Sequence, residues 1–325
     1  MVSAGEFPPI IDACALVERE TEVPADLVEG LLHKDGKLVF GGASKSFKTW
    51  TLTNLAVSVA AGADFLGRPT RKGRVLFLNL EIQPAFFARR IESVCQARAI
   101  TLESLKGNLD VWNLRGFAAD LSKLLPLLLG RIHAGDYDLL VLDPIYKLLG
   151  GRDENKAGDI ASLLNEVEKL AVHADAAVAF GAHYSKGNQA AKESIDRIGG
   201  SGVFARDPDT ILTFTRHEHD NAFTVDAVLR NHPPIEPFVV KWEFPVMRLD
   251  DSLDPERLKK AAGRRQEYAA DDLLDLLDEP MTSVEWQNAA ESELGLSERT
   301  FFRRLREVKK RGGAVQRAEG KWERK

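Results

Sequence analysis

The 325-residue sequence has few of the features that would place it outside a reducing cytoplasm. Its two cysteines, Cys14 and Cys95, are too few and too far apart for a disulfide framework or a zinc cluster. No apolar run approaches the roughly 20 residues that span a bilayer, and the N-terminus lacks a signal-peptide pattern. Internal repeats and low-complexity segments are also missing. We therefore expect a cytoplasmic globular protein with no membrane partner.

A modest net charge of −5 conceals a strong asymmetry. Residues 296–325 carry 11 Lys and Arg against 4 Glu, a net of +7, so residues 1–295 carry −12. A basic tail on an acidic body indicates that the tail has a negatively charged partner of its own.

From Lys37 onward, apolar runs of strand length alternate with helical patterns. The predicted strands are Leu38–Phe40, Gly73–Leu80, Leu109–Leu114, Leu139–Leu142, Ala176–Ala182 and Asp209–Phe214. The predicted helices between them are Thr49–Ala61, Pro84–Ala99, Ala118–His133 and Ile160–Ala174. Continuous apolar strands are expected where helices cover both faces of a sheet. The pattern predicts an α/β fold with a mostly parallel central sheet.

Changes in composition divide the chain into four parts. The predicted parts are an N-terminal lead-in (1–36) with a short helix around Ala25–Leu32, an α/β core (37–249), a linker (250–266) and a small C-terminal domain (267–325). The linker is charged, contains Pro255 and Gly263, and lacks apolar periodicity.

The most informative segment follows the first predicted strand. There an apolar strand enters a turn of small residues that ends in Lys48-Thr49 at the start of a helical pattern. Such a loop binds ATP, because backbone N–H groups surround the β- and γ-phosphates, the Lys adds positive charge and the Thr hydroxyl ligates Mg²⁺. The predicted nucleotide-binding residues are Gly42, Ala43, Ser44, Lys45, Ser46, Phe47, Lys48, Thr49 and Trp50. An ordinary strand–turn–helix is the alternative.

One position departs from the usual phosphate-binding loop, in which a Gly precedes the Lys. Here Phe47 stands in its place. If that position needs a positive φ, a Phe costs on the order of 1 kcal/mol or more. The substitution leaves open a weak affinity for ATP or a ring that stacks near the base or the ribose.

Two carboxylates follow predicted strands. Asp143 ends the strand Leu139–Leu142 and faces the crevice where open α/β sheets bind ligands, so we expect it to hold Mg²⁺ through water. Glu81 follows the strand Gly73–Leu80, and a carboxylate there can deprotonate the water that attacks the γ-phosphate. The alternatives are a strand-terminating Asp-Pro turn for Asp143 and a helix cap for Glu81.

Two more strand ends carry polar residues that can act on ATP. His183 follows the strand Ala176–Ala182 and is predicted to sense the γ-phosphate, with a satisfied core histidine as the alternative. Arg230 follows an apolar strand and, in a ring, can reach a neighbour's nucleotide as an arginine finger. It can equally be a surface charge.

The C-terminal domain reads as three helices and a hairpin, the pattern of a winged helix-turn-helix. Its last helix, Ser297–Arg311, is rich in basic residues. Positive charge also marks the loop after His183. The predicted DNA-binding residues are Arg299, Arg303, Arg304 and Lys310 on the helix and Lys186, Lys192 and Arg197 on the loop. The alternatives are a partner-docking domain and a solvated loop.

Taken in order, these motifs resemble the RepA-like branch of RecA-fold hexameric replicative helicases, which is related to the DnaB and KaiC groups. The resemblance covers about residues 23–245 and rests on the loop 42–49, Leu78-Asn79-Leu80-Glu81, Leu140-Val141-Leu142-Asp143-Pro144 and Ala182-His183-Tyr184-Ser185-Lys186-Gly187. It implies phosphate and Mg²⁺ binding by Lys48 and Thr49, a second-motif carboxylate at Asp143, a catalytic base at Glu81 and a sensor at His183. Arg230 resembles the finger of the DnaB group, and the RepA-like branch places its finger nearer Arg206.

The resemblance implies an ATP-driven, Mg²⁺-dependent homo-oligomer, expected as a hexameric ring, that translocates on single-stranded DNA in plasmid, phage or prophage replication. Duplex DNA is the expected partner of the C-terminal domain. The main alternative is an ATP-switched DNA-binding regulator or recombination-type ATPase that unwinds nothing. A KaiC-like ATPase acting on proteins is disfavoured by the +7 tail.

Overall fold

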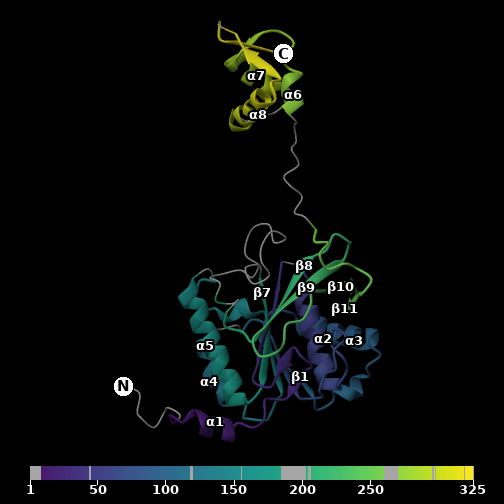
Figure 1. Cartoon of the computed structure of the whole chain (residues 1–325). Helices are drawn as coiled ribbons and strands as arrows, with labels where there is room; N and C mark the ends of the chain where they lie inside the picture. Colours follow the sequence, from purple (N-terminus) through teal and green to yellow (C-terminus); the bar gives the residue numbers. More distant parts are fainter. Residues whose placement is uncertain are drawn as a thin grey trace. The chain divides into compact units, whose positions relative to one another are not determined.

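The computed structural model describes residues 9–43, 45–117, 120–154, 156–183, 203, 206–259, 270–294, 296, 298–317 and 319–324. The chain divides into two compact units, Met1–Lys260 and Ala261–Lys325 (Figure 1). Four predicted site residues, Ser44, Lys186, Lys192 and Arg197, lie outside the described residues.

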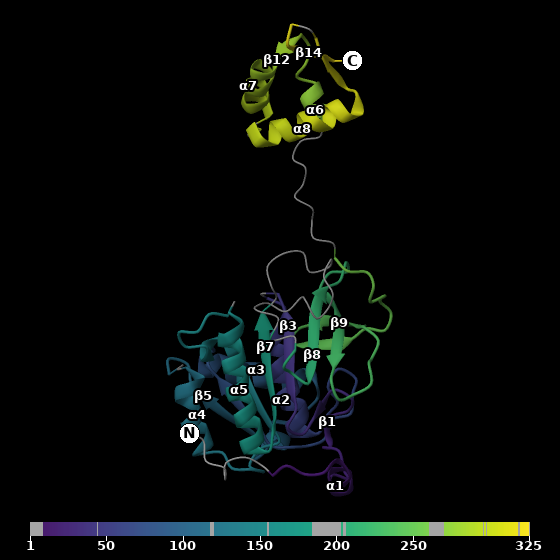
Figure 2. The ribbon, with the colours of Figure 1, turned by 60° about the vertical axis from the view of Figure 1, so that its left-hand side comes forward.

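The described part of the first unit is built on a nine-stranded sheet. Its strands are β3 (Lys37–Gly42), β4 (Val75–Asn79), β5 (Leu109–Asn113), β6 (Leu139–Asp143), β7 (Ala177–His183), β8 (Thr210–Arg216), β9 (Ala222–Leu229), β10 (Phe238–Glu243) and β11 (Val246–Leu249). Their order is β11-β10-β9-β8-β3-β7-β6-β4-β5. Figure 2 shows β7, β3, β8 and β9 side by side. The strands from β8 to β5 run parallel, and β9, β10 and β11 continue as an antiparallel meander. The prediction of an α/β fold with a mostly parallel sheet is confirmed.

Helices cover both faces of this sheet, as continuous apolar strands require. On one face lie α2 (Lys48–Ala61) and α3 (Pro84–Ala97), and on the other lie α4 (Leu121–Leu129) and α5 (Ala157–Ala174) (Figure 1). Successive strand residues point to opposite faces. Leu38 and Phe40 therefore join the core under α2, whereas Val39 between them joins the core under α4 and α5. Among the described residues, no helix is both long and apolar enough to cross a membrane.

The helix predicted around Ala25–Leu32 is wrong. The segment forms two short antiparallel strands, β1 (Asp26–Val28) and β2 (Leu32–His33). Gly30 between them has a φ of 64°, and its backbone N–H donates to Asp26 Oδ2 at 2.8 Å. A left-handed residue interrupts a right-handed helix. The helix of the lead-in is instead α1 (Ala13–Arg19), capped by Asp12.

The predicted linker starts too early. Residues 254–259 are hydrogen-bonded to β8, β9 and the turn between them. His217 Nε2 lies 2.9 Å from Asp254 O, Thr224 Oγ1 donates to Pro255 O at 2.9 Å, and Lys259 N donates to Arg216 O at 2.8 Å. The polar sequence without apolar periodicity predicted a linker here, but backbone groups of residues 254–259 form hydrogen bonds with residues of β8 and β9 and the turn between them.

In the described residues, the second unit contains three helices and a three-stranded antiparallel sheet. The helices are α6 (Ala270–Leu274), α7 (Ser283–Leu294) and α8 (Glu298–Arg311), and the strands β12 (Met281–Thr282), β13 (Ala314–Gln316) and β14 (Lys321–Arg324) follow the order β12-β14-β13. Trp286 and Phe301 lie at the centre of its core, with an edge-to-face ring contact at 5.8 Å. Trp286 Nε1 donates to Leu273 O at 2.9 Å, so the largest buried side chain is also satisfied.

Candidate functional site

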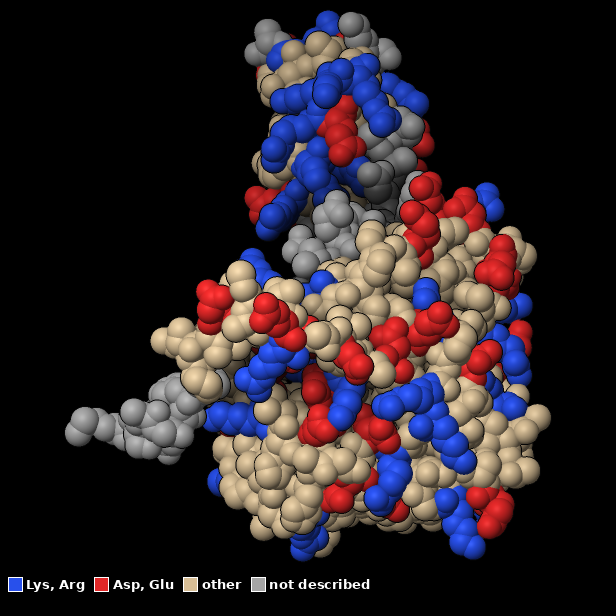
Figure 3. Space-filling view, turned by 60° about the horizontal axis from the view of Figure 1, so that its bottom comes forward, with Lys and Arg blue, Asp and Glu red and all other residues tan. Residues whose placement is uncertain are grey.

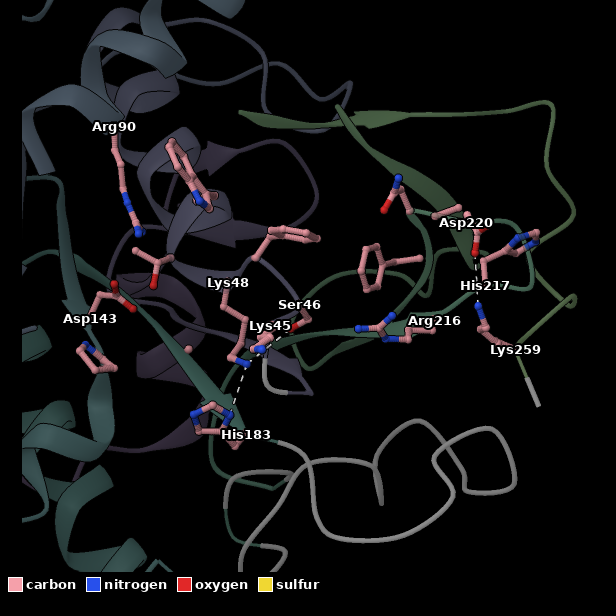
Figure 4. Close-up of a pocket in the computed structure, with 18 of the residues that line it drawn as sticks. Lys45, Ser46, Lys48, Arg90, Asp143, His183, Arg216, His217, Asp220 and Lys259 are labelled. Atoms are coloured by element: carbon pink, nitrogen blue, oxygen red, sulfur yellow. Dashed lines mark hydrogen bonds and ion pairs between the residues drawn. The ribbon is translucent and has the colours of Figure 1, made fainter. Parts of the chain in front are cut away.

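A cavity of about 940 Å³ opens where the parallel strands end. Because parallel strands all point the same way, residues after β3, β4, β6 and β7 meet at one edge of the sheet. The structure therefore brings together Lys48, Thr49, Glu81, Asp143 and His183, which lie far apart in the sequence (Figure 4). The cavity continues past the phosphate-binding loop to residues near the end of β8, among them Arg216 and Lys259.

The loop between β3 and α2 has the tight backbone that phosphate binding needs. Lys45 and Phe47 are both left-handed, with φ of 62° and 61°, and Ser46 N donates to Ala43 O at 3.2 Å. A Cβ on Gly42 would lie 2.3 Å from Ser46 Oγ, so any larger residue there would require the Ser46 side chain to move. Helix α2 begins at Lys48, and the first N–H groups of a helix have no acceptor within the helix itself, so this helix start beside the cavity suits an anion.

Lys48 reaches back over this loop. Its ammonium donates to Gly42 O at 2.8 Å and to Ala43 O at 2.9 Å, and its Nζ lies 3.5 Å from His183 Nδ1. Burial lowers the pKa of Lys48 to about 8, an effect that the nearby Asp143 carboxylate partly opposes. A partly desolvated cation held by two carbonyl oxygens is in place to exchange those contacts for phosphate oxygens.

Asp143 ends β6 and is 4% exposed. Burial raises the pKa of its carboxyl to about 6, while a hydrogen bond with Thr49 acts in the opposite direction. Carboxylate and hydroxyl oxygens are the ligands that Mg²⁺ prefers. A divalent cation beside this buried carboxylate would keep it ionised, so Thr49 and Asp143 fit the predicted Mg²⁺ site.

Glu81 is positioned by two residues whose roles the sequence did not predict. Asn79 ends β4, is 1% exposed and braces the following turn, because its Nδ2 donates to Ile82 O at 2.7 Å and its Oδ1 accepts from Ile82 N at 3.0 Å. The hydroxyl of Tyr146 donates to Glu81 Oε2 at 3.1 Å. Asn79 stands in the segment Leu78-Asn79-Leu80-Glu81 on which the resemblance rests, but no role had been assigned to it, whereas nothing in the sequence places Tyr146 near Glu81.

A third residue whose role the sequence did not predict is Arg90, on α3. It lines the cavity, with its guanidinium carbon 4.7 Å from the centre of the Trp50 ring (Figure 4). Burial lowers its pKa, opposed by the carboxylates of Asp143 and Glu81. Arg90 is therefore a cation directed at the same space as Lys48.

His183 lies on the opposite side of the cavity from Arg90 (Figure 4). Burial, and to a smaller extent the charge of Lys48, lowers the pKa of the His183 imidazole, which favours its neutral form.

The ring of Phe47 packs against protein. It stacks on Trp242 of β10 with the ring centres 4.0 Å apart and the planes at 9°, and it meets the Phe223 ring edge-on at 6.1 Å. Trp50, one turn along α2, lies 5.3 Å from Phe244 and 6.0 Å from Trp242. The contact with Trp242 takes up one face of the Phe47 ring, and Phe47 also lines the cavity, so a weak affinity for ATP and stacking near the base or the ribose both stay predictions.

Arg230 lies near the amino ends of the parallel strands, opposite the ends where the cavity opens. It follows the last residue of β9, which pairs with Thr210 at the start of β8, whereas Gly42 pairs with Phe214 near the end of β8. The Arg230 guanidinium donates to Arg206 O and lies 3.8 Å from Asp209 Oδ1. The structure thus places Arg230 and Arg206 side by side and away from the phosphate-binding loop of the same chain.

On α8, the predicted DNA-binding residues separate into two groups. Arg299, Arg303 and Lys310 are exposed, and Arg306 completes a stripe spaced at 4, 3 and 4 residues along one helix face. Figure 3 shows Lys and Arg side chains gathered over the second unit. The prediction for Arg304 is wrong, because its side chain is 3% exposed and its Nη1 donates to Glu307 Oε2 at 2.6 Å. A helix turns 100° per residue, so Arg304 falls on the buried face with Phe301, Leu305 and Val308.

Comparison with known proteins gives one family. A comparison with curated proteins found no match. The family model described as AAA domain matches residues 6–189, more than half of the chain, and this range holds the phosphate-binding loop, Glu81, Asp143 and His183. Together with the mostly parallel sheet and the loop that joins β3 to α2, this match establishes that the chain belongs to the AAA domain family of P-loop ATPases.

Proposed function

We propose that this P-loop ATPase is a ring-forming motor that translocates on single-stranded DNA, a replicative helicase of a plasmid, phage or prophage in the RepA-like branch. The observation that carries the proposal is the pairing, within one chain, of an ATP site with a separate compact unit whose α8 exposes a stripe of four cations. Evenly spaced cations on one helix face match the repeating charge of a nucleic-acid backbone.

In the ATP site, each residue has a role that its position supports. Lys48 and the loop backbone hold the β- and γ-phosphates, and Thr49 and Asp143 hold Mg²⁺. Bound Mg²⁺ would neutralise charge on the phosphate oxygens as it develops. Glu81, oriented by the Tyr146 hydroxyl, accepts a proton from the attacking water. His183 lies 3.5 Å from Lys48 Nζ, where it can report the presence of the γ-phosphate.

Ring formation is supported by where the two candidate finger residues lie. Arg230 and Arg206 lie at the sheet edge opposite the phosphate-binding loop. Either can therefore act on a nucleotide only if that nucleotide is bound by a neighbouring subunit. An arginine finger supplied across a subunit boundary stabilises charge in the transition state.

For the second unit we propose a winged helix that binds duplex DNA through α8. Three helices followed by the β13–β14 hairpin fit this arrangement, with α8 as the recognition helix. The same features fit an ATP-switched DNA-binding regulator that unwinds nothing, which is the second candidate.

One experiment separates the two. The ATPase rate is measured with and without single-stranded DNA, together with strand displacement on a forked duplex, for the wild type and for Lys48→Ala. A motor shows stimulation by single-stranded DNA and ATP-dependent displacement, and both are lost in Lys48→Ala. DNA binding that responds to ATP without any displacement identifies the regulator, and an ATPase indifferent to DNA refutes both.

A further inference from the structure

Phe47 holds a backbone conformation that its side chain disfavours. Its φ and ψ are 61° and 21°, in the left-handed region, and it is the residue directly before α2. Phosphate-binding loops usually carry a Gly at this position, where no Cβ opposes a positive φ. For a bulky residue the disadvantage corresponds to roughly tenfold or more in the conformational equilibrium. Something else in the structure must therefore hold the loop in this shape.

The packing around Phe47 supplies a compensating interaction. The face of its ring lies on Trp242 at 4.0 Å and 9°, and Phe223 meets it edge-on at 6.1 Å. Both geometries are favourable for aromatic pairs, and each pair is worth from a few-fold to about tenfold beyond the area it buries. The two effects are of similar size and opposite sign, so the stack can offset the strain.

Trp242 is itself fixed. It lies on β10, between β9 and β11, and pairs with Met247 on β11. Its backbone N–H donates to Asn221 O at 2.7 Å. The first turn of α2 is tied to the same meander by the ring contacts of Trp50 with Trp242 and Phe244. A side chain on a rigid antiparallel sheet can therefore fix the position of the loop.

We propose that Trp242 is a positioning residue for the nucleotide, and that it acts through Phe47. The stacked pair holds the residue before Lys48 in the left-handed conformation, which in turn directs the loop N–H groups and the Lys48 ammonium toward the phosphates. The phosphate-binding loop of this chain thus replaces the flexibility of a glycine with a long-range aromatic contact. The inference rests on the loop being the ATP site and is independent of any motor activity.

The test is a double-mutant cycle on the full chain. Binding of Mg²⁺ with a non-hydrolysable ATP analogue is titrated for Trp242→Leu, Phe47→Gly and the double variant. Trp242→Leu should weaken binding by about tenfold, since the strain of Phe47 is then uncompensated. In the Phe47→Gly background the same change should have little further effect, because Gly needs no support at positive φ. Equal losses in both backgrounds would overturn the proposal.

Two further variants and one control separate positioning from general damage. Phe47→Ala keeps the Cβ and loses the ring, so it should bind about tenfold more weakly than Phe47→Gly. Trp242→Phe keeps a ring that can stack and should recover most of the affinity lost in Trp242→Leu. Trp112→Leu removes a half-buried Trp on β5, at the far edge of the sheet, and serves as the matched control. Phe47→Ala binding as tightly as Phe47→Gly would contradict the inference.

The readouts also distinguish failure of this inference from failure of the ATP site. Lys48→Ala must lose most of its affinity for the analogue if the loop binds phosphate at all. If Lys48→Ala binds normally, the site itself is misplaced. If Lys48→Ala fails while Trp242→Leu binds like the wild type, the site stands and the positioning role is refuted. A thermal unfolding curve for each variant shows that the comparison is made on folded protein.

Discussion

Removing two exposed cations from α8 should weaken DNA binding in a way that depends on salt. Arg303 and Lys310 lie seven residues apart on the same exposed helix face, two turns from one another. Each phosphate contact contributes about 0.9 to the slope of log K against log salt, so Arg303→Ala/Lys310→Ala should flatten the slope by about 1.8. Between 50 and 200 mM salt, the advantage of the wild type should then shrink about tenfold.

Extending the change to the whole stripe gives a larger effect. With Arg299 and Arg306 also replaced by Ala, four contacts are lost, the slope should flatten by about 3.6, and the same salt interval should erase about a hundredfold difference in affinity. All four side chains are exposed, so the fold should persist. Arg304 is left in place because it is buried and paired with Glu307.

The matched control removes the same charge from the same unit. Arg317 lies 2.5 Å from Glu323 and Arg324 lies 3.2 Å from Asp275, so both cations are already neighboured by carboxylates. The assay is fluorescence anisotropy of labelled single- and double-stranded DNA at several salt concentrations, with basal ATP hydrolysis measured in parallel. Arg317→Ala/Arg324→Ala should change the slope by less than half as much. Equal flattening in both doubles would show that only net charge matters, and no flattening in either would mean that the unit docks a protein partner.

Four further predictions concern the ATP site. Lys48→Ala should abolish hydrolysis and most nucleotide affinity while leaving the fold intact, and near-normal turnover would remove the assignment of the loop. Burial lowers the pKa of Lys48 to about 8, so its ammonium loses its proton above that pH, and the affinity for ATP measured by titration should fall between pH 7 and 9, by up to about tenfold per pH unit. An affinity that does not change with pH would show that the charge of Lys48 does not contribute to binding. Glu81→Gln should bind Mg²⁺ and ATP but hydrolyse ATP on the order of 10²-fold more slowly or worse in single-turnover assays, and wild-type turnover by this variant would place the base elsewhere. Asp143→Asn should instead raise the Mg²⁺ concentration that hydrolysis requires. Arg230→Ala should bind ATP without hydrolysing it and should regain activity when mixed with Lys48→Ala protein. If this mixture fails at every ratio and a mixture with Arg206→Ala restores activity instead, the finger is Arg206.

Much of the ATP site was predictable because parallel strands bring their carboxyl ends to one edge. Lys48, Thr49, Glu81, Asp143 and His183 each follow or end an apolar run, and their order along the chain, together with the family resemblance, led us to expect them in one site. Asn79, Tyr146 and Arg90 were missed for the opposite reason. Each acts through a contact between elements, and no local pattern reveals such a contact.

Elsewhere, local pattern and tertiary context disagree. The segment Ala25–Leu32 has a helical pattern of apolar residues, yet the left-handed Gly30 turns it into a hairpin whose Leu and Val side chains fill the core. Arg304 belongs to a basic run, yet helical periodicity and the packing of Phe301 and Leu305 bury it. Composition gives the charge of a segment, and packing decides which charges reach solvent.

The sequence by itself determined the class of the protein, the α/β order of its core and the position of the phosphate-binding loop. These depend on residues close together in the chain, whose spacing sets strand, turn and helix. Only the tertiary structure decided how the loop tolerates Phe47, because the compensating ring of Trp242 comes from β10, almost 200 residues away in the sequence. From the local sequence one can expect that a Phe at this position is strained. The contact with Trp242 that offsets the strain forms only when the chain folds.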